Sequence, residues 1–478
     1  MNEKIIGRER EFSQLNKCLH SNQAELIIVY GRRRVGKTFL INQFFKGRFD
    51  FKISGSYGQT KEIQLKNFIN ELNLQSKNKN TITDNWTDAF FLLRNYLENL
   101  SKDEKHVIFF DEMPWLDTPK SNFLAAFEYF WNSWGSSQDN LICIVCGSAT
   151  SWLVDNIAKN KGGLYNRQTC RIYLEPFTLN ETETYLSVNG FEWSRYTIVQ
   201  NYMIMGGIPY YLSLLDQNLS FEENIDNMFF RKRALLWDEF EHLYATLFTN
   251  SEQYLKVVEA LSTKRAGLTR REISDISKLP SNGALTKILE NLINSDFVRP
   301  YNFFGNKKQD MIYQLSDYFT LFYFKFLKNN FGKDEHFWSN SLDNPSRKAW
   351  EGFTFEQVCK DHISLIKKKI GINAVLTEIS TWNTKGVEEH EGAQIDLLID
   401  RRDKVINICE IKFYSDEVQI NKDYEAKLRR KIESFRAETN TKKALQLVMI
   451  TTYGVKQNMY SNKVHSQVTM DDLFSSLS

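Results

Sequence analysis

Three features are scarce or missing in this chain of 478 residues: long apolar runs, regularly spaced cysteines and net charge. No run approaches the roughly 18 apolar residues of a membrane span, and the first residues, Met1–Gly7, lack an apolar signal core. The six cysteines lack disulfide-framework spacing, and Cys143 and Cys146 lie in an apolar run that favours buried thiols over zinc ligands. We therefore expect a cytoplasmic protein that does not bind a membrane.

The charge balance also restricts the class of partner. A formal net charge of +2 provides no general attraction to a polyanion, so any surface that binds nucleic acid must be local. Apolar residues make up 42% of the chain and charged residues 25%, which is ordinary for a soluble globular protein. A chain of 478 residues is too long for one hydrophobic core, and we expect roughly three domains.

Residues 31–38 read GRRRVGKT and match the phosphate-binding pattern G-x-x-x-x-G-K-[ST]. The motif lies between an apolar strand-like run, residues 24–30, and a helical pattern that begins at Phe39. We expect Lys37 to reach the β- and γ-phosphates of a nucleoside triphosphate and Thr38 to offer its hydroxyl to Mg2+. The expected nucleotide-binding residues are Gly31, Arg32, Arg33, Arg34, Val35, Gly36, Lys37 and Thr38. The three arginines contact phosphate or a partner subunit, or they are solvated, because the motif leaves their positions free.

Two further apolar runs end in polar side chains that suit nucleotide hydrolysis. Residues 106–110 precede Asp111 and Glu112, an arrangement that predicts Asp111 near Mg2+ and Glu112 as the base beside the attacking water. The alternative is an acid pair that caps a helix. Residues 141–146 precede Ser148, which we expect to contact the γ-phosphate or the water, unless it is an ordinary turn serine.

Arg167 follows a glycine pair, Gly162 and Gly163, and precedes a strand-like run over residues 169–174. An arginine on such a loop can neutralise charge on the γ-phosphate, within one subunit or from a neighbouring one. The alternative is a surface arginine. The order of strand, P-loop, helix, acid-ended strand and polar-ended strand predicts a doubly wound parallel sheet that binds ligands at its carboxyl edge.

Several motifs recur together along the chain, in the order Ile6-Gly7-Arg8-Glu9-Arg10-Glu11, residues 31–38, Asp111-Glu112, Gly147-Ser148, Leu164-Tyr165-Asn166-Arg167 and Gly206-Gly207-Ile208-Pro209-Tyr210-Tyr211-Leu212. Together they resemble the archaeal and bacterial P-loop ATPase family, related to the AAA+ and STAND proteins, whose members often carry a C-terminal nuclease-like domain. The resemblance implies ATP as the nucleotide and a helical lid that contains the Gly-Gly-Ile-Pro segment. Asn166 departs from the family pattern, because many relatives have glycine before the arginine.

The pattern changes near Ser251 to short helices followed by a hairpin. Thr269 and Glu272 form a capping box for one helix, and Ser281 is positioned to cap the next. Strand-like runs at residues 297–299 and 311–315 then flank a basic turn. This order predicts a winged helix-turn-helix.

Local charge supports a nucleic-acid contact in this part of the chain. Residues 251–328 contain 12 Lys and Arg against 8 Asp and Glu, a difference of +4. Winged helices also dock proteins or act as nucleotide-sensing appendages, so these two alternatives remain. The residues expected to meet phosphates or a groove are Arg270, Arg271, Asn282, Thr286, Lys287, Lys307 and Lys308.

The last part of the chain carries a second candidate catalytic site. Runs at residues 394–400 and 405–412 predict adjacent antiparallel strands, and alternation puts Glu410 and Lys412 on one face. With Asp396, the two carboxylates can bind Mg2+, while the lysine orients or activates water for phosphodiester attack. Glu356, on a preceding helix, is a candidate third metal ligand.

This constellation resembles the PD-(D/E)XK nuclease core, with Asp396, Glu410 and Lys412 at the positions of the motif. Ile395 departs from the motif, which has proline at that place. The alternative is an inactive core that binds DNA or docks a protein.

The expected fold is α/β: a P-loop core over residues 1–175, a helical lid over 176–248, a winged helix-turn-helix over 249–328 and a restriction-endonuclease-like domain over 345–478. The leading hypothesis is an ATP- and Mg2+-dependent ATPase whose hydrolysis gates or positions a nuclease-like domain on DNA. The alternative is a nucleotide-dependent regulatory switch whose C-terminal domain only binds nucleic acid or protein. The ATPase domain is a candidate surface for homo-oligomer formation.

Overall fold

A computed structural model of the chain describes residues 5–148, 150–158, 163–164, 166–248, 250–305, 311–330, 332–384 and 393–476. The chain forms two compact units. The N-terminal unit comprises Met1–Pro176 and Leu243–Ser251, and the C-terminal unit comprises Phe177–His242 and Glu252–Ser478. Within the described residues, each helix is too short or too polar to cross a membrane.

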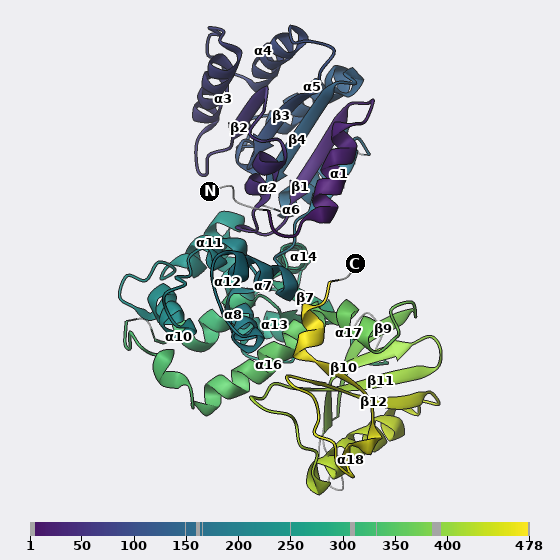
Figure 1. Cartoon of the computed structure of the whole chain (residues 1–478). Coiled ribbons are helices and arrows are strands. Elements are labelled where there is room, and N and C mark those ends of the chain that lie inside the picture. The colour runs from purple at the N-terminus through teal and green to yellow at the C-terminus, as the bar shows by residue number, and fades with distance from the viewer. Residues whose placement is uncertain are drawn as a thin grey trace. The chain divides into compact units, whose positions relative to one another are not determined.

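The N-terminal unit is built on a five-stranded sheet in the order β2-β3-β4-β1-β5, and every pair in it is parallel (Figure 1). Its strands are β1 Glu25–Tyr30, β2 Phe51–Ser54, β3 His106–Asp111, β4 Leu141–Gly147 and β5 Cys170–Tyr173. The predicted parallel sheet is confirmed. Because β1 pairs with β4 and β4 with β3, the carboxyl ends that carry the P-loop, Ser148 and Asp111 lie side by side.

Helices cover both faces of this sheet, which explains why its central strands are apolar without alternation. Their bounds are α1 Glu9–Leu19, α2 Lys37–Phe44, α3 Lys61–Ser76, α4 Trp86–Glu98, α5 Phe123–Ser133 and α6 Thr150–Leu153. In Figure 1, α3, α4 and α5 pack over one face, and their side chains share a buried aromatic core with Phe51 and Phe110. On the other face, Phe49 packs against Phe109. Cys143 and Cys146 are buried in β4, as predicted.

The C-terminal unit begins with a group of helices where the lid was predicted. They are α7 Leu179–Val188, α8 Arg195–Met205, α9 Pro209–Leu212, α10 Phe221–Ile225 and α11 Glu239–Leu247, and the last of these extends into the N-terminal unit. Gly206 and Gly207 turn the chain between α8 and α9 with φ values of 64° and 66°. A Cβ at Gly207 would approach the Phe177 carbonyl oxygen to 2.1 Å, so only glycine fits there.

Three helices and a three-stranded antiparallel sheet follow. They are α12 Ser251–Ser262, α13 Arg270–Ser277, α14 Gly283–Asn294, β6 Leu268–Thr269, β7 Val298–Tyr301 and β8 Ile312–Leu315, with sheet order β6-β8-β7. The capping box of Thr269 and Glu272 is confirmed. The predicted cap at Ser281 is wrong: Asn282 caps α14, and its side chain accepts from the backbone nitrogens of Ala284 and Leu285.

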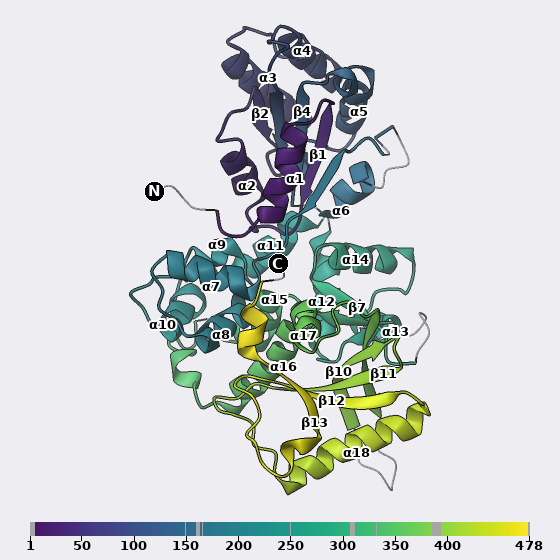
Figure 2. The same ribbon diagram turned by 45° about the vertical axis from the view of Figure 1, so that its right-hand side comes forward.

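A second five-stranded sheet, in the order β13-β12-β11-β10-β9, forms the last part of the chain. Its elements, with the helices around them, are α15 Tyr318–Phe322, α16 Pro345–Asp361, α17 Ile363–Lys369, β9 Thr377–Thr384, β10 Ala393–Arg401, β11 Val405–Lys412, α18 Lys422–Thr439, β12 Ala444–Thr451 and β13 Val464–Thr469. The predicted antiparallel pairing of β10 and β11 is confirmed, whereas β11, β12 and β13 are parallel. Figure 2 shows α18 along this sheet, where Leu428 packs against Met449.

The hairpin of β7 and β8 is fastened to this second sheet. Phe303 forms a bridge with Thr381 of the edge strand β9, and the Phe304 nitrogen donates to the Thr381 oxygen at 2.9 Å. The Phe304 ring packs on Phe435 of α18, with ring centroids 5.0 Å apart. Arg299 of β7 also pairs with Asp361 at the end of α16. Backbone pairing at the edge and buried rings behind it therefore join the two predicted domains into one body.

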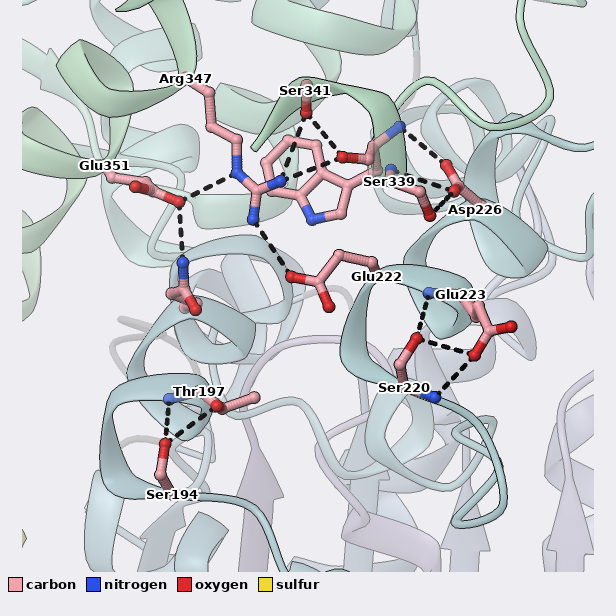
Figure 3. Close-up of polar contacts among 12 residues, drawn as sticks. Ser194, Thr197, Ser220, Glu222, Glu223, Asp226, Ser339, Ser341, Arg347 and Glu351 are labelled. Atoms are coloured by element: carbon pink, nitrogen blue, oxygen red, sulfur yellow. Dashed lines mark hydrogen bonds and ion pairs between the residues drawn. The ribbon is translucent and has the colours of Figure 1, made fainter. Parts of the chain in front are cut away.

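A buried polar network joins the lid helices to α16 (Figure 3). The Arg347 side chain is only 2% exposed; it pairs with Glu351 at 3.1 Å and with Glu222 at 3.6 Å. Its guanidinium also donates to the Trp338 carbonyl at 3.0 Å and lies 4.0 Å from the centre of that indole ring. The Asp226 carboxylate accepts a hydrogen bond from the backbone nitrogen of Trp338 at 2.8 Å. The stretch before α16, polar and irregular in sequence, is thus held in place by the Arg347 guanidinium and by Asp226.

Candidate functional sites

Two glycines shape the P-loop. Gly31 has φ 145°, and a Cβ there would come within 2.4 Å of the Leu174 carbonyl oxygen. Gly36 has φ 93° and caps the amino end of α2. A side chain is therefore excluded at Gly31 by contact and disfavoured at Gly36 by backbone conformation. The loop can turn its N–H groups and the amino end of α2 toward a phosphate.

Lys37, in the first turn of α2, is buried beside the loop. Its Nζ donates to the carbonyl oxygens of Gly31 at 3.1 Å and Arg32 at 2.6 Å. Burial lowers the pKa of Lys37, and the negative charges of Asp111 and Glu112 oppose that shift. An ammonium held this way is available to the phosphates of a nucleotide on the loop.

Thr38 and Asp111 meet at the carboxyl edge of the sheet, as predicted from their positions in sequence. The Thr38 hydroxyl lies 3.0 Å from each carboxylate oxygen of Asp111. A hydroxyl and a carboxylate are hard oxygen donors of the kind that Mg2+ prefers, so this pair fits the ion.

Glu112 is held by Ser148, a contact that the sequence did not indicate. Glu112 has a left-handed backbone, with φ 44° and ψ 45°, which turns its side chain away from the course of β3. Its carboxylate accepts from the Ser148 nitrogen at 3.1 Å and from the Ser148 hydroxyl at 3.0 Å. Ser148 was expected to contact the γ-phosphate or the water; in the structure it orients the candidate base.

Ser148→Ala is expected to lower ATP turnover by about tenfold, because a hydrogen bond to a charged group contributes about 1.5–3 kcal/mol to holding Glu112 in place. Affinity for ATP should stay unchanged. Phosphate release and nucleotide binding, measured on the same preparation, check both statements. Ser137→Ala, which removes a hydroxyl bonded to the Trp134 carbonyl, is the matched control. Wild-type turnover by Ser148→Ala would show that this contact is not used in hydrolysis.

The arginines differ in their surroundings. Arg32 is 6% exposed and Arg33 donates to the Thr246 hydroxyl, so the simple solvated interpretation is wrong for both. Arg167 is exposed after a turn in which its nitrogen donates to the Leu164 oxygen at 3.1 Å. Asn166, before it, has φ 55°, a left-handed conformation that glycine and asparagine adopt more readily than other residues. The departure at Asn166 is therefore compatible with this turn.

In the second candidate site, Glu410 and Lys412 share one face of β11, as strand alternation predicted. The Lys412 Nζ lies 2.8 Å from Glu410 Oε1, and the Lys431 Nζ lies 2.7 Å from Oε2. Tyr424 also donates to Oε1 at 3.2 Å. Glu410 is 4% exposed, and these two lysines lower its pKa against the opposing effect of burial. Lys431 and Tyr424 come from α18, whose position over the sheet no local pattern revealed.

Asp396 and Glu356 are the other two acids predicted for this site. Continuing the register from Leu397 opposite Cys409 places Asp396 across from Glu410, next to a β-bulge between β10 and β9. Burial, with the Glu410 charge next, raises the pKa of Asp396. Burial, followed by the Asp396 charge, raises the pKa of Glu356 to about 8. The three carboxyl groups are thus close enough to influence one another.

The carboxylates of this site fit a metal ion that is held by two of them together with water or substrate. Across the ranges that the structure describes, there is no group of three or more His, Cys, Asp or Glu side chains arranged to hold a metal. The structure therefore does not bring Glu356 into a three-acid cluster with Asp396 and Glu410. Two carboxylates are enough for Mg2+, which is often bound by one or two carboxylates together with water and substrate phosphate.

Several residues expected to contact nucleic acid are occupied within the chain. The Arg270 guanidinium donates to the Ser281 hydroxyl at 3.1 Å, to the Thr286 hydroxyl at 2.6 Å and to the Asn282 carbonyl at 2.6 Å. The Asn282 side chain caps α14. The expectation that Arg270, Asn282 and Thr286 face nucleic acid is thus not supported by these contacts. Lys307 and Lys308 lie outside the described residues.

Comparison with known proteins shows what the N-terminal part of the chain is similar to. Residues 5–215 match the family model described as an ATPase domain predominantly from Archaea. An uncharacterised ATP-binding protein of Methanocaldococcus jannaschii is 46% identical over 44 residues, 9% of this chain and 75% of that protein. The N-terminal part of the chain therefore carries an ATP-binding ATPase domain.

Longer similarities extend beyond this domain. An uncharacterised protein of M. jannaschii is 26% identical over 416 residues, 86% of this chain and 87% of that protein. A Walker-type ATPase of Pyrococcus abyssi is 21% identical with a TM-score of 0.47, covering 67% of this chain and 96% of that one. The ORC2 protein of Aeropyrum pernix is 12% identical with a TM-score of 0.42, covering 76% and 98%. TM-scores of this size do not carry function over to this chain.

Proposed function

We propose that this protein is an ATPase whose hydrolysis controls a metal-dependent, nuclease-like site that acts on DNA. The nuclease-like part of the proposal rests on one observation: Asp396, Glu410 and Lys412 lie close together on the C-terminal sheet. The Lys412 Nζ is 2.8 Å from Glu410 Oε1. The ATPase half of the proposal rests on the family match and on the grouping of Lys37 with Asp111 at the end of β3 and Glu112 directly after it. A P-loop alone binds a nucleotide, and these acids supply the groups for hydrolysis.

In the ATPase site, each side chain has one role. Lys37 neutralises charge on the β- and γ-phosphates, and Thr38 and Asp111 would hold Mg2+. Glu112, oriented by Ser148, accepts a proton from the attacking water. Arg167 reaches the γ-phosphate of its own or a neighbouring subunit, and in the second case the active ATPase is a homo-oligomer.

In the nuclease-like site, Asp396 and Glu410 would hold Mg2+, which when bound supplies Lewis-acid polarisation of the phosphodiester. Lys412 orients the attacking water and stabilises negative charge on the phosphate. Lys431 and Tyr424 hold the Glu410 carboxylate in position. We further propose that α13, α14 and the β7–β8 hairpin form a winged helix that contacts the DNA backbone through Arg271 and Lys287, which lie outside the internal Arg270 cluster.

The test is incubation of the full chain with Mg2+ or Mn2+ and several forms of DNA, with and without ATP. We expect metal-dependent cleavage, and we expect Glu410→Ala to lower it by about 100-fold or more, because one of two metal carboxylates is lost. Glu433→Ala, which removes an exposed acid from α18, is the matched control. The nuclease proposal fails if the wild type does not cleave, or if Glu410→Ala cleaves equally well.

A nucleotide-dependent switch with an inert C-terminal domain is the second candidate. It is favoured by one observation: both oxygens of Glu410 already pair with lysine side chains. Bound ATP would then change DNA or protein binding by the chain without any cleavage. The same incubation, read by electrophoretic mobility instead of product formation, separates the two functions.

A further inference from the structure

Two of the nuclease-like residues, Asp396 and Lys412, line a partly open pocket. Within the C-terminal unit, a cavity of about 660 Å3 lies between α16, strands β9 to β11 and the segment around β7. Asp396 and Lys412 line it, as do Arg265, Lys348 and Lys360. A cavity of this size suits one small molecule or a short piece of a chain.

The lining combines positive charge with aromatic rings. Four cationic side chains border the cavity against two acids, Glu356 and Asp396. Tyr301, Phe303 and Tyr414 are among the rings that line it, and Tyr414 is 53% exposed. Proteins that bind single-stranded nucleic acid use this combination, with cations along the backbone and rings on which bases stack.

A buried glutamine belongs to the same wall. Gln314 lines the cavity and is 2% exposed. Its Nε2 donates to the Arg265 carbonyl at 2.8 Å, whereas its buried Oε1 accepts no hydrogen bond from any residue that the structure describes.

One wall of the cavity is fixed by pairing at the edge of the second sheet. Phe303, which lines the cavity, is bridged to Thr381 of β9, and its neighbour Phe304 is packed on Phe435. Bases inside a duplex are stacked and paired, and an enzyme that reads one in a pocket must take it out of the stack or use a single strand. Moving this wall aside for a wider ligand would require breaking the pairing of Phe303 with the edge strand β9.

We infer that this cavity binds an unpaired DNA strand, a single-stranded region or an overhanging end, with a base stacked on the Tyr414 wall and phosphate beside Lys348 and Lys412. The inference names the substrate class of the proposed nuclease-like site and in that respect rests on the proposed function. Binding itself needs no metal and can be measured without cleavage.

The experiment measures fluorescence anisotropy of the full chain in EDTA, with a labelled strand of about 12 nucleotides, within the size range of single-strand sites. The same strand in a blunt duplex is the comparison. We expect the single strand to bind at least about tenfold more tightly, and Tyr414→Ala to weaken it by about tenfold through loss of one stacking contact. Lys348→Ala should weaken binding and lower the salt dependence by about one counterion.

Two variants serve as controls. Tyr414→Phe keeps the ring and should bind the strand like the wild type, and Lys325→Ala removes an exposed lysine that does not line the cavity. Equal binding of strand and blunt duplex, absence of binding, or unchanged affinity in Tyr414→Ala would overturn the inference. Strand binding through Tyr414 without cleavage in Mg2+ would instead remove the nuclease proposal and leave this binding site standing.

Discussion

Glu112→Gln is expected to bind ATP about as tightly as the wild type and to hydrolyse it about 10²- to 10⁴-fold more slowly. The amide keeps the shape of the side chain and can still pair with Ser148, but it cannot accept a proton from water. Phosphate release under saturating ATP measures the loss, and binding of a fluorescent ATP analogue measures the affinity.

Two controls make this result specific. Lys37→Ala is expected to lose nucleotide binding itself, because its buried ammonium lies beside the loop that holds the phosphates. Glu98→Gln changes an exposed glutamate of α4 that pairs with Arg94 on the same helix, and it should hydrolyse normally. Normal turnover by Glu112→Gln would remove this residue from the mechanism, whatever Lys37→Ala does.

Arg347→Met is expected to lower the free energy of unfolding of the C-terminal unit by about 3–5 kcal/mol. Removal of one partner from a buried ion pair leaves the other charge uncompensated, and Glu351 is only 7% exposed. Gln200, which donates to Glu351 at 3.0 Å, cannot replace the lost charge. Urea denaturation followed by tryptophan fluorescence measures the change, since Trp338 lies against the arginine.

The neighbouring lysine provides a matched control. Lys348 of α16 pairs with Asp343, which lies just before that helix, and the Lys348 side chain is 61% exposed. Lys348→Met should therefore change the free energy of unfolding by no more than about 0.5 kcal/mol. A double variant, Arg347→Met with Glu351→Gln, should recover part of the loss because it removes the stranded charge. Equal effects of Arg347→Met and Lys348→Met would contradict the stabilising role of the network.

Local patterns predicted which polar residues meet at the carboxyl edge of the first sheet. Apolar runs without alternation indicated buried parallel strands, and the polar residues after each run indicated the edge where Thr38 and Asp111 meet. The same reasoning could not find the contact of Ser148 with Glu112. That contact depends on the left-handed backbone at Glu112, which turns the side chain toward the next strand.

For the nuclease-like site, strand geometry predicted which residues of β10 and β11 lie close together. Alternation put Glu410 and Lys412 together, and pairing of β10 with β11 brought Asp396 opposite Glu410. Lys431 approaches Glu410 from α18, 21 residues further along the chain, so its role depends on how that helix lies over the sheet. The hydrogen bonds that Arg270 donates to Ser281, Asn282 and Thr286 likewise depend on how α13 packs against the start of α14.

The sequence by itself determined the phosphate loop, the parallel sheet and the pairing of Glu410 with Lys412, because each follows from the spacing of residues that are neighbours in a loop or a strand. The tertiary structure decided what surrounds them. It joined the β7–β8 hairpin to the edge of the second sheet, buried Arg347 among lid and α16 residues, and placed Asp396 in the wall of a pocket. Those contacts join residues far apart in the chain, and only packing of whole elements against one another brings them together.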